Sequence, residues 1–262
     1  MVTVLGIPLD ENSSFLQGAA AGPQCIRDAY HSPSANYWSE SGIDLSRVKE
    51  WKDQGDLLLS PGIQAITDIE RGIAAQLAAG HKTLSLGGDH SITYPIIKAY
   101  AKHYPGLNIL HIDAHADLYH DFEGNPYSHA SPFARIMEQH LVKRLVQVGI
   151  RTLTQHQREQ AAKFGVEIIE MKDWKDDTEL SFDGPLYISL DLDAMDPAFV
   201  PGVSHHEPGG FSVRQVLSII QRVQGTIVGA DIVELNPTRD IQQVTAMVAA
   251  KCFKELLTRM LH

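Results

Sequence analysis

The side chains best suited to chemistry form a short polar run, Asp113, His115 and Asp117, directly after an apolar stretch that ends at Ile112. In extended backbone, side chains at alternate positions point the same way. We therefore expect these three groups to converge on one point. Because nitrogen and oxygen donors are mixed here without cysteine, the run favours a borderline divalent metal ion.

Two further motifs offer ligands of the same kind. Asp191 and Asp193 follow a second apolar run, and His90 follows a third. A single Asp-x-Asp is more often a solvated turn or a helix cap. None of these motifs contains Lys or Arg, however, and buried anions without a partner are very costly. The carboxylates therefore predict bound cations, and four aspartates match the charge of two divalent ions.

A pair of metal ions would give the site hydrolytic chemistry. Two ions about 3.5–4 Å apart polarise a bridging water and make hydroxide available near neutral pH. Ligation by His and Asp favours Mn²⁺, with Fe, Co, Ni and Zn as poorer alternatives.

Alternating strand-like and helix-like segments must position these groups. The alternation predicts βαβ units and a mostly parallel sheet with helices on both faces, in a single three-layer α/β/α domain over residues 1–262. Each polar motif, and Glu234, follows a predicted strand, where such sheets bind ligands. The predicted strands are 3–7, 83–86, 108–112, 145–149, 166–170, 186–190 and 226–233; the predicted helices are 23–30, 62–79, 91–103, 129–140, 155–164, 212–223 and 241–261.

The amino-acid composition limits the classes of molecule that the protein is expected to bind. The net charge of −10, from 32 acidic and 22 basic residues, argues against nucleic acid and anionic membranes and favours small cationic molecules or metal ions. No run is long and apolar enough to span a bilayer. Cys25 and Cys252 suggest no disulfide framework, and the first residues resemble a strand rather than a signal peptide. We therefore expect a reducing, cytoplasmic location.

Four segments resemble the signatures of the ureohydrolase family, which includes arginases and agmatinases, and they occur in the family's order along the chain. They are Gly87–Ser91, Asp113–Asp117, Ser189–Pro197 and Asp231–Pro237. The opening Gly6–Asp10 is similar too. The resemblance implies an arginase-like fold, two Mn²⁺ per chain and a homo-oligomer, either a trimer or a hexamer. It implies six metal ligands: His90 and Asp117 for one ion, His115 and Asp193 for the other, and Asp113 and Asp191 as bridges.

The resemblance also assigns the catalytic group, His129, Glu234 and Asp117. Glu234 would hold the substrate's guanidinium, a planar cation that pairs well with carboxylate. His129 would protonate the departing amine, which leaves poorly without a proton. Spacing alone leaves a surface salt bridge for Glu234 and an ordinary helix position for His129 as alternatives. The implied reaction is attack of hydroxide on the guanidinium carbon, followed by collapse of a tetrahedral intermediate to urea and an amine.

The sequence carries features of more than one substrate class. Tyr119 stands where many arginases have Asn, and no acid follows the Gly149–Arg151 strand end. The segments 117–138 and 202–210 nevertheless resemble the plant-type arginase branch, which lacks the same acids. We therefore expect hydrolysis of L-arginine to L-ornithine, with agmatine to putrescine as the alternative and other guanidino compounds still open. The candidate donors to an α-carboxylate are Asn125, Tyr127, Ser204 and His205.

Other classes fit the sequence less well. A mononuclear zinc amidohydrolase of the deacetylase type needs fewer carboxylates than the two aspartate pairs and Glu234 provide. A regulatory or scaffold homologue would usually lack a ligand or the shuttle histidine, and none is missing. A phosphoesterase would need a Gly-rich phosphate cradle or an Arg clamp at the strand ends, and we find neither.

Overall fold

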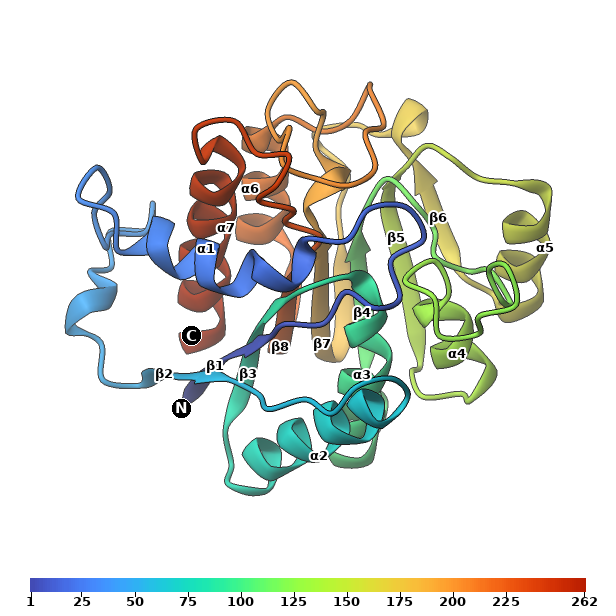
Figure 1. The fold of residues 1–262 in the computed structure, drawn as a ribbon, viewed down its shortest axis with the longest axis horizontal. Helices are drawn as coiled ribbons and strands as arrows, with labels where there is room; N and C mark the ends of the chain where they lie inside the picture. Colours follow the sequence, from blue (N-terminus) through green and yellow to red (C-terminus); the bar gives the residue numbers. More distant parts are fainter.

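Eight strands form one sheet in the order β2-β1-β3-β8-β7-β4-β5-β6 (Figure 1). The computed structural model describes all residues from 1 to 262. Every neighbouring pair of strands runs parallel, so the sheet predicted to be mostly parallel is parallel throughout. The strands are β1 (Val2–Ile7), β2 (Trp51–Asp56), β3 (Lys82–Gly87), β4 (Asn108–Ile112), β5 (Arg144–Ile150), β6 (Glu167–Glu170), β7 (Ser181–Asp191) and β8 (Gln224–Val233).

Helices cover both faces of the sheet, which confirms the predicted three-layer α/β/α architecture (Figure 1). Along β1, Val2 and Val4 face one apolar core while Leu5 and Ile7 face the other, as alternation along a strand requires. The helices on the first face are α1 (Gly22–Tyr30), α6 (Val213–Arg222) and α7 (Val244–Leu261); those on the second are α2 (Gln64–Ala78), α3 (Thr93–His103), α4 (Pro132–Glu138) and α5 (Gln155–Phe164).

Several elements differ from the prediction; β7, for example, begins at Ser181 rather than at 186. The edge strand β2 was not predicted, because its sequence, Trp-Lys-Asp-Gln-Gly-Asp, is polar and largely exposed. The helix predicted at 129–140 begins only at Pro132, since the residues before it form the loop that carries His129. The last helix begins at Val244 rather than 241, because Gln242 and Gln243 have left-handed backbone (φ 50° and 62°).

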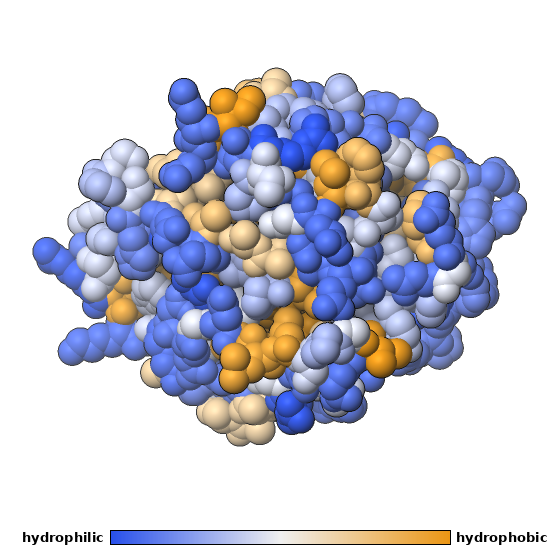
Figure 2. Space-filling model, viewed as in Figure 1, coloured by the Kyte–Doolittle hydropathy of each residue, from blue (hydrophilic) through white to orange (hydrophobic).

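The face in Figure 2 is mostly hydrophilic, with apolar residues in separate groups. None of the helices combines the length and the apolar character that crossing a membrane would need. Cys25 and Cys252 are both free thiols.

Candidate active site

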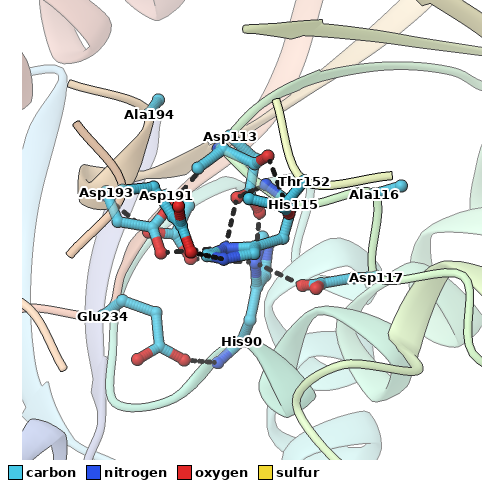
Figure 3. A network of polar contacts seen from close by, with 12 residues as sticks. His90, Asp113, His115, Ala116, Asp117, Thr152, Asp191, Asp193, Ala194 and Glu234 are labelled. Carbon is cyan, nitrogen blue, oxygen red and sulfur yellow. Dashed lines mark hydrogen bonds and ion pairs between the residues drawn. The ribbon is translucent and has the colours of Figure 1, made fainter. Parts of the chain in front are cut away.

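The site lies at the carboxyl ends of four adjacent central strands, β3, β8, β7 and β4. His90 follows β3, Glu234 follows β8, Asp191 ends β7, and Asp113 follows β4. Because parallel strands place these ends at one edge of the sheet, residues far apart in sequence meet there. The structure brings together all six predicted metal ligands and Glu234 (Figure 3).

The backbone that carries Asp113, His115 and Asp117 is not the extended strand that the sequence predicted. β4 ends at Ile112, the residues from Asp113 to His115 form bends, and the chain stays irregular through Asp117. The N–H of His115 donates to Asp113 Oδ1 at 2.6 Å, and Asp117 has a left-handed φ of 48°. The side chains therefore converge through a tight turn rather than through strand alternation, so that part of the prediction was wrong.

Carboxylate oxygens surround two imidazole nitrogens. His90 Nδ1 lies 3.1 Å from Asp113 Oδ2, 3.1 Å from Asp117 Oδ2 and 3.2 Å from Asp191 Oδ2. His115 Nδ1 lies 3.1 Å from Asp193 Oδ2 and 3.5 Å from Asp113 Oδ1. Asp113 thus turns one oxygen toward each histidine, the arrangement needed for a carboxylate that bridges two ions.

The hydrogen bonds of His90 show what its Nδ1 is free to do. Ser189 Oγ donates to Asp231 Oδ1 at 2.7 Å, so it accepts from His90 Nε2, 2.9 Å away. With the proton on Nε2, Nδ1 presents a lone pair. This buried Nδ1 has no hydrogen-bond partner, although three carboxylates face it. A lone pair among anions is favourable only with a cation between them, so the donor set fits a metal ion.

Electrostatics support the same conclusion. Burial, together with the Asp193 and Asp113 carboxylates, raises the pKa of Asp191 well above its usual range. Burial is also the main cause that raises the pKa of Asp193, to about 6. No Lys or Arg pairs with any of these carboxylates, whose ion-pair partners are all histidines. Divalent cations would offset this repulsion, and the His/Asp donors match that need.

His111 is a neighbour of the cluster that the sequence analysis missed. Gln147 Nε2 donates to the carbonyl of Ala116 at 2.7 Å, which fixes the amide orientation, and the same nitrogen donates to His111 Nδ1 at 2.9 Å. The His111 proton therefore sits on Nε2, which donates to Asp113 Oδ2 at 2.6 Å. A buried histidine two residues before Asp113 on an apolar strand was the available signal.

Glu234 and His129 form a buried pair beside the carboxylates. Glu234 Oε1 accepts from the N–H of His90 and from His129 Nδ1, both at 2.8 Å. Burial alone would lower the pKa of His129, but the Glu234 carboxylate outweighs it and raises that pKa to about 9. His129 Nε2 lies 2.8 Å from Ser14 Oγ and 3.1 Å from the Ser14 N–H. Ser14, also missed, offers an acceptor to the charged ring and a donor to the neutral ring.

A cavity of about 220 Å³ opens onto these groups. Its lining includes Asp117, His129, Glu234 and His205. Of the four residues predicted to donate hydrogen bonds to a substrate α-carboxylate, His205 is the one that lines it. The other three do not line the cavity. Asn125 Nδ2 donates to Asn12, Ser204 Oγ donates to the carbonyl of Leu16, and Tyr127 stacks on Tyr94. The loops fold back on their own neighbours, which sequence spacing does not reveal.

Comparison with known proteins identifies the family. The arginase family model matches residues 1–258. The chain is 45% identical over 282 aligned residues to a mitochondrial arginase of Medicago truncatula, covering 98% of this chain and 81% of that protein. It is 33% identical to an agmatinase of Bacillus anthracis, covering 98% and 90%.

These relatives overturn the cytoplasmic location expected from the sequence. The plant arginases of similar sequence are named as mitochondrial or as chloroplastic and mitochondrial proteins. Low cysteine content and a strand-like beginning were the basis of the prediction, and neither feature separates the cytoplasm from the interior of an organelle.

The fold leads to the same family as the sequence. The solved structure of arginase from Medicago truncatula superimposes with a TM-score of 0.94 and 43% identity, covering 99% of this chain and 87% of that one. Sequence, fold and the strand-end motifs therefore agree with the resemblance drawn from the sequence. The chain belongs to the arginase family and is a ureohydrolase.

Proposed function

We propose that this protein hydrolyses L-arginine to L-ornithine and urea with two Mn²⁺ per chain. The observation that carries the proposal is the position of the Glu234–His129 pair in the same cavity as the buried aspartates. The proposed ligands are the six predicted ones, His90, Asp113, His115, Asp117, Asp191 and Asp193. The 45% identity to a protein named arginase supports arginine as the substrate.

The side chains of this chain supply binding and proton transfer. Glu234 Oε1 is occupied by His90 and His129, while Oε2 accepts no hydrogen bond from the chain and is free for a guanidinium. His129, with its pKa raised to about 9, is charged at neutral pH and has a proton for the departing amine. When bound, the ions would supply Lewis-acid activation of water.

Agmatine is the second candidate substrate. Three of the four predicted donors to an α-carboxylate lie outside the cavity, and agmatine has no carboxylate to be bound. Agmatinase relatives at 33% identity over 98% of the chain support this alternative.

A panel of substrates tests the proposal. We expect the Mn²⁺-loaded protein to release urea from L-arginine or agmatine, and to release no acetate from acetyl-lysine. The variant Asp191→Ala should lose bound metal and urea release together, because it removes a bridging carboxylate. Full turnover with retained metal in this variant would show that the proposed ligands are wrong. Acetate release without urea would favour the deacetylase class.

A further inference from the structure

One acid in the cavity has no hydrogen-bond partner. The carboxylates of Asp117, Asp191 and Asp193 face histidines, and Glu234 accepts two hydrogen bonds. Glu207 also lines the cavity, but its carboxylate accepts no hydrogen bond and pairs with no Lys or Arg.

The backbone at Glu207 is held firmly in place. Arg151, which follows β5, donates from Nε and Nη2 to the carbonyl of Glu207 at 2.9 and 2.5 Å. The same guanidinium donates to the carbonyls of Asp193 at 2.8 Å and Ala194 at 3.1 Å, beyond the end of β7. Arg151 therefore fixes the loop of Glu207 to two strand ends, so the position of this acid relative to the cluster is built into the fold.

The side chain of Glu207 faces the cavity and solvent. The nearest ionisable group to its carboxylate is His115, whose Nε2 lies 3.9 Å away, beyond hydrogen-bond distance. The side chain is 39% exposed, so it keeps contact with water at the cavity's opening. Its position beside a candidate metal ligand places it on the substrate's side of the cluster.

In the remaining wall of the cavity the one charged ring is His129, whose Nδ1 already donates to Glu234 at 2.8 Å. Tyr119, Phe122, Thr152 and Gln157 are neutral, and no Lys or Arg lines the cavity. Burial, and repulsion from His129, lower the pKa of His205 below its usual value. A second cation bound near Glu207 would therefore meet attraction without competition from a Lys or Arg side chain, since the charge of His129 is paired with Glu234.

We propose that Glu207 binds the second positive charge of a doubly charged guanidino substrate, the primary ammonium of arginine or agmatine, while Glu234 holds the guanidinium. This inference rests on the proposed function and makes Glu207 a specificity-determining residue. It follows that a substrate binds more tightly when the end opposite its guanidinium carries a primary ammonium. A neutral or anionic end, as in pentylguanidine or 4-guanidinobutyrate, does not gain this contact.

The experiment compares two substrates of equal length. Agmatine and pentylguanidine differ in the terminal ammonium, which is a methyl group in the second. For Glu207→Gln we expect the KM for agmatine to rise about tenfold, and the ratio of kcat/KM for agmatine over pentylguanidine to fall by a similar factor. The matched control is Glu50→Gln, which removes an equal charge from an exposed position away from the cavity.

Calorimetric binding of putrescine, which has ammonium groups but no guanidinium, gives a second readout. We expect Glu207→Gln to weaken it and Glu50→Gln to leave it unchanged. An unaltered substrate ratio with unaltered putrescine binding would overturn the inference. Equal loss on both substrates would also overturn it and would indicate that Glu207 acts through His115. If no guanidine yields urea with the unmodified protein, the proposed function fails, and putrescine binding still tests Glu207.

Discussion

At the scale of single residues, the proposed reaction assigns proton transfer to the buried Glu234–His129 pair. Because His129 supplies the proton for the departing amine in the proposed reaction, His129→Asn should lower kcat about a hundredfold while urea remains the product. Steady-state urea release measures this. A variant with unchanged kcat would show that another group donates the proton.

The same pair makes the stability of the metal-free protein depend on pH. Glu234 raises the pKa of His129 from 6.5 to about 9. The stabilisation from this raised pKa is fully present below pH 6.5 and is lost as the pH rises through about 9. Thermal unfolding of metal-free protein should therefore show a larger loss for His129→Asn at pH 6.5 than at pH 9.5. An equal loss at both values would contradict the assigned shift.

His111 should act through Asp113 rather than on the substrate. His111→Phe removes the donor to Asp113 Oδ2, and loss of such a supporting hydrogen bond typically weakens metal binding about 10–100-fold. His111→Gln, which keeps a donor near the Nε2 position, should retain more of the affinity. Calorimetric titration with Mn²⁺ measures both, with His103→Phe on the exposed end of α3 as the control. A folded His111→Phe with unaltered affinity would remove His111 from the site.

At the scale of elements, the close approach of strand ends depends on Gly88. Its carbonyl accepts from the N–H of Glu234 at 2.8 Å, and its N–H donates to Ile7 at 3.0 Å. A Cβ here would collide with the backbone carbonyl of Leu9. Gly88→Ala should therefore destabilise the protein by about 1–3 kcal/mol and weaken Mn²⁺ binding, because it displaces His90 and Glu234.

The control for this prediction is a glycine whose backbone is left-handed but where an added Cβ would meet no other atom. Gly165 ends α5 with a left-handed φ of 66°, and nothing lies within 4 Å of the position that a Cβ would take there. Gly165→Ala should cost about 1 kcal/mol and leave Mn²⁺ affinity unchanged. Thermal unfolding and metal titration of both variants separate backbone strain from displacement of the site. Equal effects of the two variants on metal affinity would contradict the role given to Gly88.

The central strands could be predicted because burial on both faces gives continuous apolar runs, as in β4 and β7. Their polar ends followed from the same pattern, and they carry the candidate ligands. The edge strand β2 could not be predicted in this way, since its exposed residues need not be apolar. The turn at Asp117 and the loop contacts that hold Asn125 and Ser204 outside the cavity depend on tertiary packing, which local spacing does not encode.

At the scale of the whole molecule, metal binding and stability should be linked. An ion that binds only the folded state at a thousand times its Kd adds about 4 kcal/mol. For a chain of this length we therefore expect saturating Mn²⁺ to raise the Tm of chelator-treated protein by on the order of 10 °C. Calorimetric unfolding with and without Mn²⁺ measures the shift. An unchanged Tm at saturation would contradict binding within the fold.

The trimer or hexamer implied by the family resemblance stays a prediction, as does the single domain over residues 1–262. Light scattering during gel filtration measures the first. Limited proteolysis tests the second, because one cooperative domain should resist cleavage as a unit. A stable fragment that keeps part of the sheet would contradict it.

The number of Mn²⁺ ions bound per chain tests the central claim most directly. After equilibrium dialysis, elemental analysis of the unmodified protein should give about two ions, and Asp113→Ala, which lacks the shared carboxylate, should retain fewer than one. No bound metal in the folded unmodified protein, or two ions in the Asp113→Ala variant, would contradict a binuclear centre at these strand ends.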